Sequence, residues 1–496
     1  NIKKNFYNKH KKLFGFNYPT KKVYIDSIEA DVFYDLKKIR ASNKETFLKN
    51  TYKTKKSNIY YKGKWINVKK INKNYFTEDN NFLIGPAIFC DYNTTFFIEK
   101  SWIIKKLSTG DFLIHKQEKT TNKKYFSKSN KSNPEMLEVF NSLFYSVAEQ
   151  MGIVLKNTAQ SINVKERMDF SCALFSSKGD LIANAPHIPI HLGAMSDTVK
   201  YLISKHSKSF KKGISLLHNN PYSGGTHLPD LTVITPLLNK HKNAVSYFLA
   251  NRAHHSDIGG ITPGSMPAFS KKILDEGIIF DGLPILEKER INEDLILNEL
   301  KKGPFPSRDP YQNLYDIRAQ IASNQKGIIE LRRIINKYGE NTVKRYVNYI
   351  QNNCRKIIST VIKKIPPSKF RTQMDNGATI NIKINFNSKD KKLYINFFNS
   401  SEQLKNNFNA PKSVTKSVII YFLRTLIKED IPLNEGFLKD VKLIIPEDSF
   451  LNPVYPSPVV AGNVETSQTL IDTLNAALKV QAACYGTMSN ITFGNK

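Results

Sequence analysis

The chain has 496 residues, of which 40% are hydrophobic and 11% aromatic, so it can bury a large core in two or more domains and is neither disordered nor fibrous. Its 74 Lys and Arg against 43 Asp and Glu leave a net charge of +31, which suggests nucleic acid as a partner. The lysines are spread along the whole chain in short runs with asparagine, however. We therefore interpret the charge as a bias of composition and expect no nucleic-acid partner, with a basic nucleic-acid-binding protein as the remote alternative.

Residues 1–115 show short strand patterns separated by turn residues, which predict a small β-rich unit. The strand candidates are residues 22–25, 57–61, 65–68 and 94–98. The polar stretch that follows, residues 116–132, is rich in lysine and has no apolar periodicity. We interpret it as a linker to a second domain.

The second domain is expected to cover residues 133–496 and to begin with a helix. Asn133 is a suitable N-cap, and Pro134 suits the first helical position. Apolar residues then recur at the spacing of a buried helical face. These residues are Met136, Val139, Phe140, Leu143, Phe144, Val147 and Met151.

Hairpins and further helices are predicted in the rest of this domain. The hairpins pair residues 169–175 with 181–185 and residues 230–238 with 244–252, and a third turns near residues 388–391. Helical periodicity covers residues 316–338, 342–365 and 417–428. Because this order is not a regular βαβ alternation, we predict an α+β fold: a small β-rich unit followed by a large mixed α/β domain.

The cysteines and the apolar segments bear on location. Cys90, Cys172, Cys354 and Cys484 are far apart and form no Cys-x-x-Cys pair, so we expect neither disulfides nor a cysteine zinc site. A cytoplasmic location fits this best. The apolar stretch of residues 418–423 is far shorter than the ~20 residues of a spanning helix, and we expect no membrane partner.

Histidines are strongly clustered. Eight of the ten fall within residues 187–255, and five of these lie in segments punctuated by Gly or Pro, with Asp230 and Asp257 beside them. Imidazole with carboxylate is a ligand set for zinc, manganese or iron rather than for calcium. The five histidines are His187, His191, His227, His254 and His255.

The second hairpin brings several of these side chains together. From the position of its turn, paired residue numbers sum to about 483, which sets Asp230 opposite Ala253. His227, Asp230, His254 and His255 then lie at the open end of one hairpin, and we predict that they hold a metal. Two His and one Asp from adjacent strand ends suit a three-ligand site with open positions. Alternatively, these side chains cap strand ends and bond the loop backbone.

Glycines flank the histidine segments. Glycine permits close backbone approach and positive φ, as an anion-binding or oxyanion pocket needs, so we predict substrate contacts here. An ordinary loop explains the glycines equally well. The candidate substrate-binding residues are His187, His191, Gly224, Gly225, Gly259 and Gly260.

The segment of residues 460–468 places Asn463 and Glu465 behind a glycine. Glu465 is a candidate base or further ligand. A helix cap at Asn463 or Thr466, leading into a helix over residues 470–480, is the alternative. A Gly-x-x-x-x-Gly-Lys-Ser/Thr motif does not occur in the sequence, so no P-loop is predicted.

These segments closely resemble the hydantoinase B/5-oxoprolinase family, from about Asn133 to the C-terminus. The motifs that carry the resemblance are residues 166–172, 185–193, 252–266, 316–320 and 462–468, and Asn220-Pro-Tyr-Ser-Gly-Gly-Thr-His-Leu-Pro-Asp230. Residues 1–115 resemble the tail of the hydantoinase A part, especially residues 12–16 and 85–88. An A part fused ahead of a B part is similar to ATP-dependent 5-oxoprolinase. We therefore interpret the chain as a piece of a longer polypeptide.

The resemblance implies a division of labour. The A part, ahead of this piece, binds ATP and phosphorylates the amide oxygen of 5-oxoproline, and the B part completes ring opening to glutamate. Related acetone carboxylases carry manganese in a motif similar to His227, Asp230 and the pair His254 and His255. The expected cofactors are thus a divalent metal (manganese, zinc or magnesium) and ATP bound outside this piece. Hydantoin hydrolysis and ATP-dependent ketone carboxylation by the same family are the alternatives.

Within this hypothesis the metal polarises the amide carbonyl or activates water. The candidate catalytic residues are Glu465 and Asp257, the latter as a partner that orients a ligand imidazole. Asn220 stands where the family usually has Asp, so a carboxylate is lost there. The expected partners are a small cyclic amide, the A-type region in the same longer chain, and further copies in a homo-oligomer.

Overall fold

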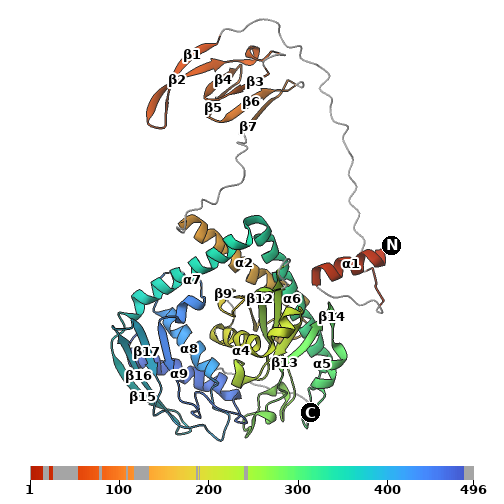
Figure 1. The fold of residues 1–496 in the computed structure, drawn as a ribbon, viewed down its shortest axis with the longest axis vertical. Coiled ribbons are helices and arrows are strands. Elements are labelled where there is room, and N and C mark those ends of the chain that lie inside the picture. Colours follow the sequence, from red (N-terminus) through yellow and green to blue (C-terminus); the bar gives the residue numbers. More distant parts are fainter. Residues whose placement is uncertain are drawn as a thin grey trace. The chain divides into compact units, whose positions relative to one another are not determined.

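The structure, a computed structural model, describes residues 2–14, 22–25, 54–77, 81–107, 110–116, 133–185, 188, 190–239, 244–429 and 431–484. The chain forms two compact units, shown in Figure 1. One unit is Tyr24–Asn130, and the other combines Asn1–Val23 with Lys131–Lys496. The predicted mixture of helices and strands is confirmed, and the fold class is α+β.

The N-terminal residues differ from the prediction. Helix α1 (Ile2–Phe14) belongs to the larger unit, where it packs against α6 (Pro310–Tyr338). Lys11 Nζ lies 2.7 Å from a carboxylate oxygen of Glu289 in the same unit. Residues 22–25, for which a strand was predicted, form no strand. Most of the predicted linker, residues 117–132, lies outside the described residues.

The small unit consists of two sheets packed on an apolar core. β1 (Lys55–Tyr61), β2 (Lys64–Ile71), β4 (Ala87–Asp91) and β5 (Thr94–Ile98) form one sheet, and β3 (Phe82–Ile84), β6 (Trp102–Lys106) and β7 (Phe112–Lys116) form the other. Phe76, Phe89 and Phe112 meet between them, with Phe89 and Phe112 ring centroids 4.6 Å apart. The strands predicted at residues 57–61, 65–68 and 94–98 are confirmed.

Helix α2 (Pro134–Thr158) begins where its cap predicted. Asn133 Oδ1 accepts the backbone N–H of Glu135 at 2.8 Å and that of Met136 at 3.3 Å. Most of the predicted apolar face is buried, but Val139 is 40% exposed. The helix therefore buries a narrower face than its sequence suggested.

A seven-stranded antiparallel sheet forms the centre of the larger unit, in the order β14-β13-β10-β11-β12-β8-β9. Two of the three predicted hairpins, β8–β9 and β11–β12, are part of it. The strands are β8 (Phe170–Ser176), β9 (Leu181–Asn184), β10 (Ser215–His218), β11 (Asp230–Leu238), β12 (Val245–His254), β13 (Asp281–Glu287) and β14 (Arg290–Ile291).

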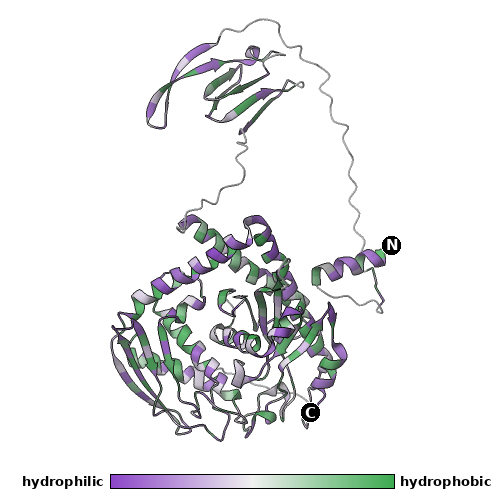
Figure 2. Cartoon of the chain, viewed as in Figure 1, coloured by the Kyte–Doolittle hydropathy of each residue, from purple (hydrophilic) through white to green (hydrophobic). Residues whose placement is uncertain are grey.

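Helices cover both faces of this sheet, α2 and α6 on one and α4 (His191–Lys211) on the other (Figure 1). Side chains alternate between the faces along each strand. On β8, Cys172 and Leu174 join the core under α2 and α6, whereas Ala173 and Phe175 join the core under α4. Because both faces are covered, almost every residue of β8, β11 and β12 is buried, including polar ones such as Asn251 and Arg252. Figure 2 colours these elements by hydropathy.

The C-terminal part adds a second sheet, β15-β16-β17-β18, in which only β17 and β18 are parallel. Its strands are β15 (Ser368–Gln373), β16 (Thr379–Asn387), β17 (Lys392–Asn396) and β18 (Val441–Ile444). Helices α7 (Glu340–Ile362), α8 (Lys412–Thr425) and α9 (Glu465–Leu478) share its apolar core. The Gly193 N–H of α4 donates to Ser417 Oγ of α8 at 3.2 Å, which joins the two sheet layers.

The remaining described helices are short. Two are α-helices, α3 (Ile162–Lys165) and α5 (Glu293–Leu300). The 3-10 turns are η1 (Lys73–Tyr75), η2 (Pro221–Ser223), η3 (Pro263–Ser265), η4 (Ile273–Asp275), η5 (Glu435–Leu438) and η6 (Val460–Asn463). The long predicted helices exist with shifted ends: α6 starts six residues early because Asp309 caps it, accepting the Gln312 N–H at 2.9 Å.

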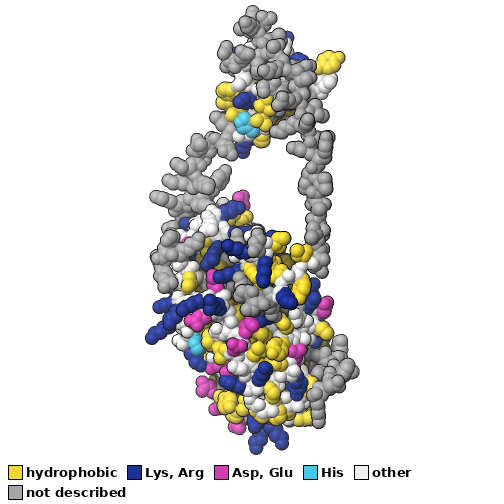
Figure 3. Space-filling model, turned by 90° about the vertical axis from the view of Figure 1, so that its right-hand side faces the viewer, with side chains coloured by type: hydrophobic (Ala, Val, Ile, Leu, Met, Phe, Trp, Pro, Cys, Tyr) yellow, Lys and Arg dark blue, Asp and Glu magenta, His cyan; other side chains and the backbone are white. Residues whose placement is uncertain are grey.

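On the face shown in Figure 3, Lys and Arg side chains are scattered among acidic and apolar ones. This distribution agrees with a bias of composition. In the described part of the chain, no helix combines the length and the apolar character needed to cross a bilayer.

Candidate metal centre

The register of the β11–β12 hairpin decides which side chains meet. Asp230 pairs with His254, not with Ala253 as the sequence predicted. A bulge causes the difference: Leu237 pairs with Tyr247 but Leu238 with Val245, so β12 carries one extra residue. A shift of one residue exchanges the faces of a strand, and it places His254 on the same face as Asp230.

His227, Asp230 and His254 form a compact cluster on the α4 face of the sheet. One ligand atom from each lies within 4.8 Å of the others. His227 Nδ1 is 3.1 Å from Asp230 Oδ2, and the two imidazole centroids are 5.0 Å apart. Asp230 is 1% exposed, yet its Oδ1 has no hydrogen-bond partner among the described residues. A buried carboxylate oxygen without a donor is costly unless a cation occupies that side.

The imidazole of His254 is neutral at neutral pH. Burial, reinforced by the nearby His227, lowers the pKa of His254 to about 4. Its Nδ1 lies 3.2 Å from the side-chain amide of Asn163 in α3, which orients the ring. A neutral imidazole keeps a lone pair for a metal at neutral pH.

The other two members attract each other. Burial disfavours charge on both, but the Asp230 carboxylate outweighs it and raises the pKa of His227. Burial also acts to raise the pKa of Asp230, but His227 and His191 hold it well below its ordinary value. Asp230 is therefore an anion that needs cationic neighbours.

His191 stands behind Asp230. As the first residue of α4, it is 1% exposed and places Nε2 3.2 Å from Asp230 Oδ2. Its Nδ1 lies 2.9 Å from Ser171 Oγ on β8, and the Thr226 hydroxyl donates to the same Asp230 Oδ2. Both ring nitrogens are thus used inside the protein, where they orient the carboxylate. His187, the other predicted substrate contact of this segment, lies outside the described residues.

The sequence analysis missed Arg252, which is completely buried beside the cluster. Its Nε donates to Thr232 Oγ1 at 2.8 Å, and one terminal nitrogen donates to Thr198 Oγ1 at 2.9 Å and to the Gly224 carbonyl at 3.1 Å. Burial lowers its pKa to about 10, while Asp230 acts in the opposite direction. An arginine within an apolar strand was the available signal, because a buried guanidinium needs partners.

His255 and Asp257 point elsewhere. His255 Nε2 lies 3.1 Å from Gln320 Oε1 of α6, and its Nδ1 lies 3.1 Å from the Asn313 amide nitrogen. Asp257 accepts the backbone N–H of Gly259 and of Gly264, each at 2.9 Å, and pairs with Arg308 at 2.9 Å. The structure thus brings His227, Asp230 and His254 together. It places His255 on the α6 face, and Asp257 binds the backbone of its own loop.

The sequence model of the family described as Hydantoinase B/oxoprolinase matches residues 133–496. The chain belongs to this family. It is 41% identical to a Dictyostelium discoideum protein named 5-oxoprolinase over 83% of this chain and 33% of that one. It is 36% identical to the Saccharomyces cerevisiae 5-oxoprolinase over 100% of this chain and 40% of that one. The chain thus spans two fifths or less of these relatives.

Among solved structures, an ATP-dependent caprolactamase from Pseudomonas jessenii has a similar fold, with a TM-score of 0.62 at 21% identity. The similarity covers 70% of this chain and 60% of the caprolactamase chain. It supports the hydantoinase B-type fold of this chain.

The glycines predicted to contact substrate are needed by the packing of the chain itself. A Cβ on Gly224 would lie 2.4 Å from the Thr198 nitrogen, and one on Gly225 2.3 Å from the Asn219 carbonyl oxygen. For Gly259 the Phe305 carbonyl oxygen would be 2.2 Å away. Gly260, with a φ of +92°, would meet the Asp275 carbonyl oxygen at 2.8 Å. These contacts favour the loop interpretation.

Glu465 is the first residue of α9 and is partly buried. The helix predicted over residues 470–480 therefore starts earlier. Its N-cap residue is Val464, which makes no side-chain cap, and the Thr466 hydroxyl donates to the Phe408 carbonyl at 2.6 Å. Neither Asn463 nor Thr466 caps the helix, so the capping roles suggested for them are not realised.

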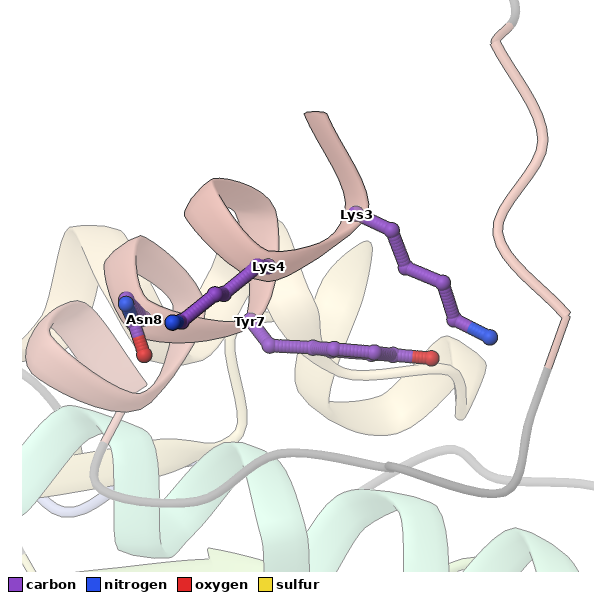
Figure 4. A pocket seen from close by; sticks show the side chains of 4 residues that line it. All are labelled: Lys3, Lys4, Tyr7 and Asn8. Carbon is purple, nitrogen blue, oxygen red and sulfur yellow. The ribbon is translucent and has the colours of Figure 1, made fainter. Parts of the chain in front are cut away.

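A surface pocket of about 320 Å³ lies on α1, far along the chain from these residues (Figure 4). Lys3, Lys4, Tyr7 and Asn8 line it, with Lys3 Nζ 5.7 Å from the Tyr7 ring centroid. This lining contains neither imidazole nor carboxylate. The buried cluster, by contrast, combines two imidazoles with a carboxylate.

Proposed function

We propose that this chain is the metal-holding part of an enzyme that opens the lactam ring of 5-oxo-L-proline to L-glutamate at the expense of ATP. One observation carries the choice of substrate: the yeast relative named 5-oxoprolinase matches over the whole chain, including residues 1–132, which precede the family match. Because the chain spans 40% of that relative, we assign the ATP site to the region that this chain does not include.

The residues of the cluster fit a divalent metal. Two imidazoles and one carboxylate are a donor set used by zinc, manganese and iron, and they leave coordination positions open. Asp230 Oδ1 has no partner among the described residues and His254 is neutral, so both retain lone pairs, and one ligand atom from each residue of the cluster lies within 4.8 Å of the others. A metal held there would polarise the amide carbonyl or make water a better nucleophile at neutral pH.

The surrounding residues hold these donors in place. His191 and Thr226 occupy Oδ2 of Asp230, so that Oδ1 stays free for a ligand role. Asn163 fixes the ring of His254, and Arg252 adds a positive charge near Asp230. Partners of this kind typically change metal affinity or activity 10–100-fold when they are removed.

Two further assignments belong to the proposal. Glu465, at the start of α9, is our candidate for the group that transfers a proton during ring opening. Asp257 holds the loop that follows His255, through Arg308 and the two glycine N–H groups. This arrangement argues for a supporting role of Asp257 rather than one in orienting a ligand imidazole.

The test uses the complete protein that contains this chain. Metal content and glutamate release from 5-oxoproline are measured with and without ATP, beside hydantoin and acetone with bicarbonate as alternative substrates. We expect ATP-dependent glutamate release and its loss, together with the metal, in His227→Ala. Turnover of hydantoin or acetone alone would assign a different reaction of the family, and retained metal and turnover in His227→Ala would refute the metal centre.

A further inference from the structure

Glu276 is a second buried carboxylate, outside the metal cluster. Glu276 directly follows η4 and has no exposed surface. The Ser270 hydroxyl donates to its Oε1 at 2.8 Å. Burial raises the pKa of this carboxyl to about 7, although the hydrogen bonds act to lower it. A carboxylate is costly to bury, so its presence here calls for a role.

The carboxylate of Glu276 binds a segment almost two hundred residues away in the chain. The Val459 N–H donates to both oxygens, at 2.9 and 3.1 Å, and the Val460 N–H donates to Oε1 at 3.1 Å. The Ile273 N–H also donates to the Pro456 carbonyl at 2.9 Å. The loop of Glu276 thereby fastens the stretch that leads into η6 and α9.

This fastened stretch leads back to the metal cluster. The side chain of Val459 is buried in the same apolar core as Leu228 and Leu231, the neighbours in sequence of His227 and Asp230. Tyr222, five residues before His227, donates its hydroxyl to the Ser457 carbonyl. The charge of Glu276 also acts on His227 and favours its positive form.

We propose that Glu276 is a positioning residue for the metal centre: through Val459 and Val460 it holds the stretch before α9 against the His227–Asp230 loop, and its negative charge favours a cation there. This inference rests on the proposed function only in assuming that the cluster holds a metal. Within the described part of the chain, the hydrogen bonds of Glu276 go to Ser270, Val459 and Val460 and not to the three residues of the cluster.

An amide cannot replace the carboxylate at this position. The Val459 N–H lies between both oxygens, and a glutamine would direct its own N–H₂ group at one of these donors. Glu276→Gln therefore removes the charge and disrupts the clamp while it keeps the size of the side chain.

The experiment measures Mn²⁺ affinity by equilibrium dialysis and amide hydrogen exchange in the complete protein. Glu435→Gln is the matched control. Glu435 likewise accepts a backbone N–H, from Leu181 at 3.4 Å, and a serine hydroxyl, from Ser196 at 3.1 Å. We expect Mn²⁺ affinity to fall about 10–100-fold in Glu276→Gln and to stay within about twofold of wild type in Glu435→Gln.

Hydrogen exchange separates positioning from a merely structural role. In Glu276→Gln we expect faster exchange both in residues 455–464 and in residues 225–231. Faster exchange in residues 455–464 alone, with unchanged Mn²⁺ affinity, would overturn the proposal. An equal loss of affinity in both glutamine variants would also overturn it.

A milder variant covers the case in which Glu276→Gln does not fold. Ser270→Ala removes one donor to the carboxylate, and we expect a several-fold loss of Mn²⁺ affinity; wild-type affinity would then refute the proposal. Affinity that depends on Glu276 in a protein without 5-oxoproline turnover would support the positioning role and refute the proposed substrate. Turnover of 5-oxoproline together with a Mn²⁺ affinity that does not change in Glu276→Gln would support the proposed substrate and refute the positioning role.

Discussion

At the open end of the β11–β12 hairpin, the two faces of the central sheet carry very different side chains. On the α4 face, Asp230 and His254 stand beside the buried Arg252, and Asp230 Oδ1 has no partner among the described residues. On the α6 face, His255 has amide partners at both ring nitrogens, and the Asn251 amide donates to the Gln320 carbonyl at 2.7 Å. On the α4 face a carboxylate oxygen without a donor lies beside two histidines, whereas on the α6 face both ring nitrogens of His255 have amide partners.

Two neighbouring histidines at the end of one strand can thus serve different purposes. Because side chains alternate, consecutive residues cannot share a face, and the choice between them depends on the register. Hydrogen bonds at both ring nitrogens tie His255 into the fold, whereas a buried carboxylate oxygen without a donor, beside two imidazoles, suits a cation. Substitutions on the two faces should therefore separate metal binding from stability.

The largest effect is expected for His254→Ala. This change removes a proposed ligand from the α4 face, so bound metal should be lost and turnover should fall by more than the about 100-fold typical of supporting residues. Metal analysis and a turnover assay check this. A variant that retains both would place the metal elsewhere and break the comparison.

A pH-dependent effect of about 3 kcal/mol on stability is expected from Glu276, whose buried carboxyl accepts hydrogen bonds from neutral donors of Ser270, Val459 and Val460. Its pKa rises from 4.5 in the unfolded chain to about 7 in the folded protein. Between these values the folded state binds more protons, so its stability falls as the pH rises.

The measurement is urea unfolding of the metal-free wild type and of Glu276→Gln across this pH range. The free energy of unfolding of the wild type should fall relative to the variant by about 3 kcal/mol from pH 4.5 to 7. If the free energies of unfolding of the two proteins changed with pH in parallel, the expected titration of Glu276 would be contradicted. Asp230, whose pKa is lowered by histidines, would show the opposite sign.

His191→Ala should weaken the metal centre without abolishing it. His191 supports Asp230 through Oδ2, and loss of such a partner is expected to cost about 10–100-fold in metal affinity. Equilibrium dialysis with Mn²⁺ measures this. Ser171→Ala, which removes only the hydroxyl behind the ring of His191, serves as a graded control with a smaller loss.

The smallest effect on Mn²⁺ affinity is expected for His255→Asn on the α6 face. Its partners Gln320 and Asn313 would be left unpaired in part, which should cost roughly 1–3 kcal/mol of stability. Mn²⁺ affinity should stay within about twofold of wild type. Loss of stoichiometric metal in this variant would show that His255, and not only His254, belongs to the centre.

Much of the fold could be predicted because local signals were strong. The cap at Asn133 placed α2, and strand-like runs separated by turn residues placed the pairs β8–β9 and β11–β12. Helices α1 and α4 were not predicted, since lysines and other polar residues interrupt their apolar pattern. Tertiary packing stabilises them, α1 on α6 and α4 on the sheet and α8.

The sequence alone determined the family, the α+β class and the small group of His and Asp residues from which a metal site would be drawn. Only the tertiary structure selected among them. A single extra residue in β12 turns His254 toward Asp230 and His255 toward α6. The polar groups around Asp230, His191 and Arg252 among them, come from segments far apart in the chain. Their proximity depends on packing between layers, which no local pattern of residues encodes.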